Sequence, residues 1–135
     1  MSLIEWTPAL SVGVARLDEQ HRTLVAMINE LHDAMAARHG KEVVGSILDR
    51  LVEYTHTHFK DEEQLLAQQG YPGLAAQKEE HGRLVGRVQQ LQEKLHAGKP
   101  LVSVEVMTFL KGWLVEHIQH EDARYGPYLN AKGIR

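Results

Sequence analysis

The stretch VMTFLKGWLVEHIQHED, residues 106–122, is an apolar run that ends in a cluster of histidines and acids. Its apolar side chains recur at the three- and four-residue steps of an α-helix, which predicts a buried helix. The inward face of that helix would carry Val106, Phe109, Leu110, Trp113, Leu114 and His117. The histidines and acids at its end are therefore either a solvated helix terminus or part of a metal site.

Three upstream segments have the same helical periodicity, and Gly or Pro separates them. We predict an N-terminal arm over residues 1–17, then a first helix with Asp18 as its N-cap that ends before Gly40. Further helices are expected over residues 42–69, 73–96 and 102–121, with a short tail after Gly126 and Pro127. Long helices joined by short loops pack as an antiparallel up-down-up-down four-helix bundle, so we predict one all-α domain, residues 1–135.

Composition excludes several classes of partner and of chemistry. The net charge of −3 disfavours nucleic acid or an anionic membrane as a partner, and the absence of cysteine excludes thiolate chemistry. No apolar run reaches the roughly 18 residues of a transmembrane helix. Glu5 falls where a signal peptide would be apolar, so we expect a cytoplasmic protein. We also expect a monomer. The nine histidines point to metal binding, a common use of imidazole.

Four histidines fall on the inward stripes of the predicted helices. His58 and Glu62 are four residues apart and therefore about 40° apart on one helix face, within the apolar stripe. His21, His81 and His117 lie on the inward stripes of the other three helices. In an antiparallel bundle, all four imidazoles would cluster near one end. Because buried ionisable groups are unfavourable unless paired or metal-bound, this pattern predicts a transition-metal site.

The remaining histidines are interpreted as structural or solvated; they are His32, His39, His56, His96 and His120. Ferritin-like di-iron bundles use a Glu-x-x-His motif on each of two helices. That spacing occurs at residues 53–56 and 93–96, but the first pair lies on a polar face and the second at a helix end. We therefore reject the ferritin-like interpretation.

Several motifs together resemble the hemerythrin family in its bacterial single-domain form, bacteriohemerythrin. They are Trp6, SVGV at 11–14, DEQH at 18–21, HFKDEEQLL at 58–66, YPG at 71–73, QKEEH at 77–81 and WLVEHIQHED at 113–122. The resemblance covers nearly the whole chain. It implies a non-haem di-iron site that binds dioxygen or another small diatomic or anionic ligand.

The resemblance also implies a ligand set. His21 and His58 would hold one iron ion, and His81 and His117 the other. Glu62 and Asp122 would bridge the two ions, together with an oxo or hydroxo group. Helical spacing alone would select Glu121 after His117, so Asp122 requires the helix to distort or end there. Inward apolar side chains at the same height are candidates for a dioxygen pocket: Leu24, Ile28, Phe59, Trp113, Leu114 and Ile118.

The third helix departs from the family pattern. The family has His-x-x-x-His there, whereas QKEEH places Gln77 at the first position. We expect Gln77 to point inward, either as a weak amide-oxygen ligand or as a hydrogen-bonding neighbour. The iron ion that loses an imidazole should bind less tightly and autoxidise faster. Two functions stay open: a dioxygen carrier, store or sensor, and a di-iron enzyme with peroxidase-, oxidase- or nitric-oxide-related activity.

Overall fold

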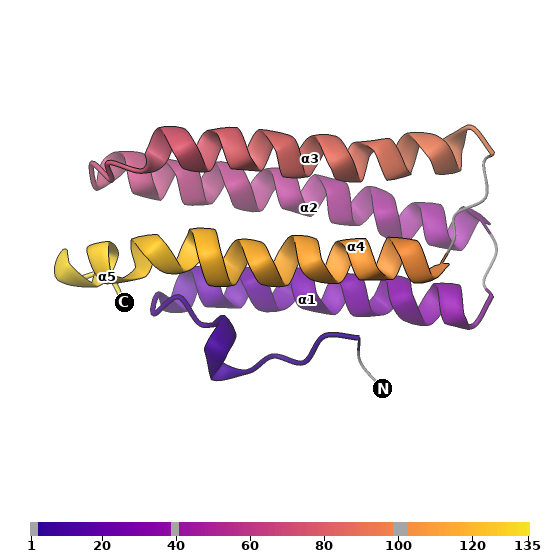
Figure 1. The fold of residues 1–135 in the computed structure, drawn as a ribbon, viewed down its shortest axis with the longest axis horizontal. Helices are drawn as coiled ribbons and strands as arrows, with labels where there is room; N and C mark the ends of the chain where they lie inside the picture. Colours follow the sequence, from indigo (N-terminus) through magenta and orange to yellow (C-terminus); the bar gives the residue numbers. More distant parts are fainter. Residues whose placement is uncertain (1–2, 39–40, 99–102) are drawn as a thin grey trace.

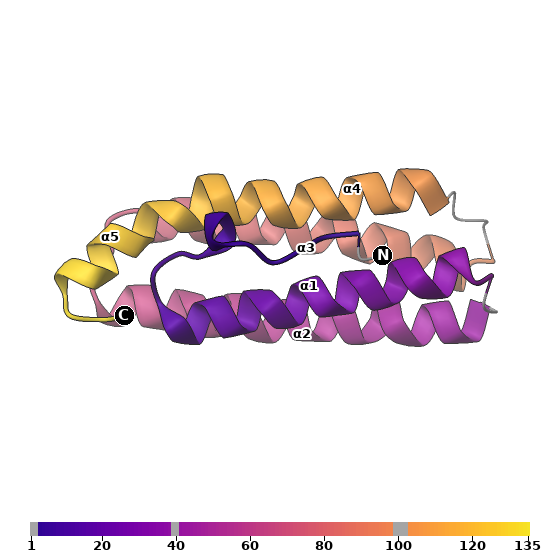
Figure 2. The same cartoon turned by 90° about the horizontal axis from the view of Figure 1, so that it is seen from below.

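The computed structural model describes residues 3–38, 41–98 and 103–135. Four long helices form the body of the molecule: α1 (Ala15–Ala36), α2 (Lys41–Gln68), α3 (Leu74–His96) and α4 (Ser103–Glu116). A π-helical segment, His117–Asp122, continues α4 into α5 (Ala123–Ala131). The long helices run alternately up and down (Figures 1 and 2), which confirms the predicted all-α antiparallel four-helix bundle.

The helices lie two by two, with α1 beside α2 and α4, and α2 beside α3 (Figure 2). Because neighbours alternate in direction, the starts of α1 and α3 share one end of the bundle with the end of α2 and the π-helical segment (Figure 1). Residues from four distant parts of the sequence therefore meet at that end.

The periodic apolar stripes form the core, as the spacing predicts. On α1, Leu24, Ile28 and Leu31 are at most 1% exposed, and they belong to the same hydrophobic core as Leu48 and Leu51 of α2. Full burial of each such side chain contributes about 1.5–3 kcal/mol. In the part of the chain that the structure describes, no helix is long and apolar enough to cross a membrane.

The N-terminal arm packs along the outside of the bundle and includes a short 3-10 turn, Pro8–Leu10 (Figure 1). The side chain of Asn29 bonds both the amide and the carbonyl of Ile4, each at 2.9 Å. Further along, the arm approaches α5 so closely that a Cβ on Gly126 would lie 2.3 Å from the carbonyl oxygen of Val12. Gly126 is therefore required for the arm to lie in this position.

The predicted N-cap role of Asp18 is wrong. α1 begins at Ala15, and Asp18 lies in its first turn. The Asp18 carboxylate reaches back to accept hydrogen bonds from the Val12 amide, at 2.8 Å, and from the Ser11 hydroxyl, at 2.5 Å. Its oxygens thus hold the arm against the helix instead of capping its first amides.

The predicted tail after Gly126 and Pro127 is also wrong, because both residues lie inside α5. Proline removes one amide hydrogen bond from a helix and usually ends it. Here Tyr125 and Leu129 are fully buried on either side of Pro127. Packing of a buried face commonly stabilises helices more than local preference does, which accounts for the continuation.

Candidate metal centre

Six ionisable side chains meet in the interior at the end of the bundle where α1 and α3 begin. Every long helix contributes to them, directly or through the π-helical segment, and each side chain is at most 5% exposed. The six are His21 from α1, His58 and Glu62 from α2, His81 from α3, and His117 and Asp122 from the π-helical segment. The residues expected from helix faces and from the resemblance are thus brought together.

Glu62 lies at the centre of three imidazoles. Its Oε1 is 3.0 Å from Nε2 of His81, and its Oε2 is 3.2 Å from Nε2 of His58 and 3.5 Å from Nε2 of His21. The pair on α2 adopts the arrangement expected from a four-residue helical step. A single carboxylate therefore faces imidazoles from three helices.

Asp122 is the second carboxylate of the site, and it faces two imidazoles. Its Oδ1 is 3.0 Å from Nε2 of His117, and its Oδ2 is 3.1 Å from Nε2 of His21. Five residues would rotate by about 140° on a regular α-helix and point the two side chains apart. The π-helical segment widens the turn, so His117 and Asp122 face the same way. The distortion required by the Asp122 assignment is therefore present.

These residues form two overlapping groups of possible metal ligands. One contains His21 and His58, the other His81 and His117, and Glu62 and Asp122 belong to both. Within each group, the ligand atoms all lie within 4.8 Å of one another. Two ions could therefore be held side by side and share both carboxylates.

The hydrogen bonds of Nδ1 in His58 and His81 indicate whether Nε2 of each ring is free to bind a metal. Nδ1 of His58 donates to Oε1 of Gln20 at 2.6 Å, and Nδ1 of His81 donates to Oε2 of Glu63 at 2.7 Å. In a neutral imidazole with the proton on Nδ1, Nε2 presents a lone pair. Among the described residues, neither Nε2 atom nor Oε1 of Glu62 has a hydrogen-bond partner, although all three atoms are buried. Lone pairs that converge in this way favour a cation between them, so the donor set fits a metal.

The pKa values agree with a site that attracts cations. Burial disfavours the charged form of His21, but the nearby Asp122 and Glu62 outweigh it and raise the pKa of His21 to about 9. Burial likewise opposes ionisation of Glu62, yet its histidine neighbours hold its pKa well below the usual range. The two carboxylates therefore remain anionic and favour positive charge in the interior, whether protons or metal ions supply it.

The comparison with protein families decides where this chain belongs. The model of the Hemerythrin HHE cation binding domain family matches residues 12–129. This chain belongs to the hemerythrin family. Bacteriohemerythrin of Methylococcus capsulatus is 42% identical over 97% of this chain and 100% of its own length. Bacteriohemerythrin of Stenotrophomonas maltophilia is 36% identical over 97% of this chain and 84% of its own.

Solved hemerythrin structures share the fold. A wild-type hemerythrin aligns with a TM-score of 0.86 and 42% identity, over 93% of this chain and 97% of that chain. A point mutant of hemerythrin aligns with a TM-score of 0.87 and 41% identity, over 94% and 97% of the two chains. The predicted membership of the hemerythrin family is confirmed along nearly the whole chain.

Gln77 lies inside this hemerythrin bundle, one helical turn before His81 on α3. It is only 3% exposed, and its side-chain amide donates to Oδ1 of Asp122 at 3.3 Å. Its inward orientation is therefore as expected from the sequence. The amide contacts a carboxylate that belongs to both candidate metal positions.

A small enclosed apolar pocket lies beside the candidate centre. Of the six residues predicted for it, the structure places four in its wall: Leu24, Phe59, Trp113 and Leu114. Ile28 and Ile118 are buried but do not line this pocket. Ile28 lies one turn further from His21 than Leu24 does, and Ile118 lies in the π-helical segment. Leu84 of α3 lines the pocket and was not predicted.

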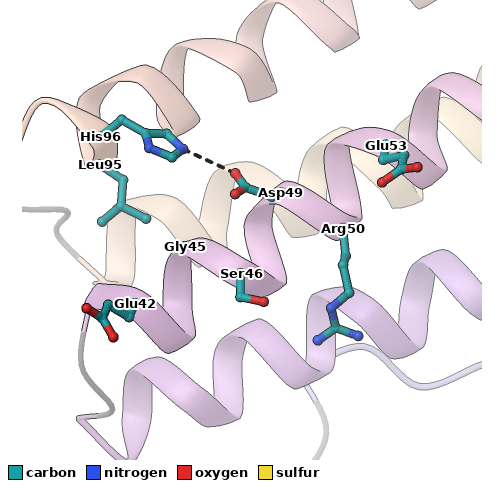
Figure 3. A pocket seen from close by; sticks show the side chains of 8 residues that line it. All are labelled: Glu42, Gly45, Ser46, Asp49, Arg50, Glu53, Leu95 and His96. Atoms are coloured by element: carbon teal, nitrogen blue, oxygen red, sulfur yellow. Dashed lines mark hydrogen bonds and ion pairs between the residues drawn. The ribbon is translucent and has the colours of Figure 1, made fainter.

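The other histidines that the structure describes take no part in the two ligand groups. His56, His96 and His120 are exposed and His32 is half-buried, while His39 lies outside the described residues. At the opposite end of the bundle, His96 points to Asp49 across an open pocket, with their nearest atoms 3.2 Å apart (Figure 3). Glu53 also lines this pocket. No residue of the rejected Glu-x-x-His pairs belongs to either ligand group.

Three residues in contact with the candidate ligands were not predicted from the sequence. Gln20 and Glu63 bond the outer nitrogens of two histidines, and the buried hydroxyl of Tyr125 donates to Oε2 of Glu62 at 2.9 Å. These contacts join different helices, so the periodicity of one helix carries no signal for them. Each of the three residues lies next to a candidate ligand in the sequence or within one helical turn of it. This proximity is the one sequence signal that could have identified them.

Proposed function

We propose that this chain is a non-haem di-iron protein that binds dioxygen, or another small diatomic or anionic ligand, in a single hemerythrin-like domain spanning residues 1–135. The observation that carries the proposal is the convergence of four Nε2 atoms on two buried carboxylates. In this proposal, His21 and His58 hold one iron ion, and His81 and His117 hold the other. Glu62 and Asp122 bridge them. Membership of the hemerythrin family supports the same assignment.

Two bound iron ions would supply the electrons and the ligand-binding position that dioxygen requires. The protein's own contribution is to hold the imidazoles in fixed orientations and to keep water away. Gln20 and Glu63 fix two imidazole rings, which raises their basicity as ligands. The apolar wall of Leu24, Phe59 and Leu114 excludes water from the approach to the centre.

Gln77 is the finer part of the proposal. It replaces an imidazole that the family pattern provides on the third helix, so the ion held by His81 and His117 has one strong ligand fewer. We expect this ion to bind more weakly and the centre to autoxidise faster than in relatives with histidine there. The buried amide at hydrogen-bonding distance from Asp122 supports a role beside the centre.

Anaerobic loading of metal-free protein with ferrous iron tests the function. We expect two iron ions per chain, and a charge-transfer band that appears when dioxygen is admitted and disappears when it is removed. Binding of fewer than two ions, or the absence of a reversible band, contradicts the proposal. Direct passage to the oxidised state with turnover of added peroxide would instead support the enzymatic alternative, which family membership does not favour.

A further inference from the structure

His58 of α2 and His81 of α3 each use Nδ1 to bond a partner, and the two partners differ in charge. His58 donates to the neutral amide of Gln20, whereas His81 donates to the carboxylate of Glu63. A hydrogen bond to an ionised acceptor is roughly twice as strong as one between neutral groups. It also places more negative charge on the imidazole, which makes Nε2 a better metal ligand.

The charged neighbours of Gln20 and Glu63 increase the difference in negative charge between the two sides. The amide of Gln20 donates to Asp61 at 2.7 Å, and Asp61 is itself paired with Arg16. The negative charge on the His58 side is therefore distant and neutralised. Among the described residues, the only ion-pair contact of Glu63 is with Nδ1 of His81. The charge of Glu63 thus acts on that imidazole.

The ring of His81 is also fixed in orientation. Phe59 stacks on it with ring centroids 3.8 Å apart and an interplanar angle of 2°. Together with the hydrogen bond to Glu63, this stacking leaves Nε2 aimed at Glu62, 3.0 Å away. Because the ring is already held in place, the His81 side chain would lose little conformational entropy when a metal binds to it.

We propose that Glu63 is a positioning residue that strengthens His81 as a ligand and thereby compensates for the imidazole missing at Gln77. The inference rests on the proposed function, because His81 and Gln77 lie on the same helix and serve the same metal position. The anionic support of Glu63 is thus given to the metal position that, by the family pattern, would have a further imidazole at residue 77. The other position has a neutral support behind His58.

Cobalt titration of metal-free protein tests this compensation. The visible absorption of Co²⁺ reports both its affinity and its ligand geometry, independently of dioxygen binding. In the wild type we expect two binding steps. In Glu63→Gln we expect one step to weaken by about 10–100-fold, with a changed spectrum for that ion. In the Gln77→His background, where an imidazole is restored, the same substitution should weaken binding much less.

Two controls separate positioning from general effects of charge or folding. Glu53→Gln removes an equal charge from an exposed position on α2, far from the centre, and should leave both steps unchanged. Denaturant unfolding of the metal-free variants checks that Glu63→Gln still folds. Unchanged cobalt binding in Glu63→Gln, or equal weakening in both backgrounds, would overturn the compensation by Glu63. Fewer than two cobalt ions in the wild type would overturn the proposed function as well.

Discussion

Nε2 of His117 lies 3.0 Å from Oδ1 of Asp122 although the two residues are five positions apart, a step that a regular helix would turn to different faces. The π-helical segment creates this contact and supplies an acid to both candidate metal positions. The exchange of α-helical for π-helical geometry over one turn therefore lets Asp122 face the same interior site as His117.

Asp122→Asn should reduce the bound iron to one ion or fewer per chain, because it removes the charge of a carboxylate that both positions share. Metal analysis after anaerobic loading and desalting measures this. Glu121→Gln is the matched control, since regular helical spacing would have selected that neighbour instead. Loss of iron in the Glu121 variant but not in the Asp122 variant would refute the assignment.

Gln77→His should increase iron affinity and slow autoxidation, because it returns an imidazole to the buried position one turn before His81. The rate of decay of the dioxygen-dependent absorption band provides the measurement. Gln90→His is a suitable control, because residue 90 is exposed on the same helix. A faster decay in the Gln77 variant would mean that the native amide protects the centre.

Leu24→Ala should have two separable effects. Removal of a buried leucine lowers the free energy of unfolding by about 2–5 kcal/mol, and here it also opens the apolar wall to water and speeds autoxidation. Leu31→Ala removes an equally buried leucine of α1 that does not line the pocket. It should lower stability similarly without changing the autoxidation rate. Equal autoxidation rates in the two variants would show that the wall does not control access of water.

Gly126→Ala should lower the free energy of unfolding by about 1–3 kcal/mol, because the added Cβ would overlap the Val12 carbonyl and displace the arm. Urea denaturation followed by circular dichroism measures the change. Gly112→Ala is the control: its Cβ would meet nothing within 4 Å, so it should be neutral or stabilise by up to about 1 kcal/mol. A Gly126 variant as stable as the wild type would show that the arm is not held at this contact.

The periodicity of the sequence predicted the bundle and the inward faces of His21, His58, His81 and His117, because a buried stripe repeats every 3.6 residues whatever the partner helix. It could not select Asp122, since a π-helical turn breaks that repeat; the resemblance to hemerythrins supplied it. Contacts between helices, such as Glu63 with His81, depend on how helices are rotated against each other. The continuation of α5 through Pro127 depends on the burial of Tyr125, which local preferences do not reveal.

The sharing of Asp122 by both ligand groups has a consequence for how the protein matures in the cell. Synthesis proceeds from the N-terminus, so His21, His58 and Glu62 leave the ribosome long before Asp122 does. Neither position of the proposed centre can acquire its full ligand set before Asp122 has left the ribosome. Iron would therefore be captured only when the π-helical segment has folded against α1, α2 and α3.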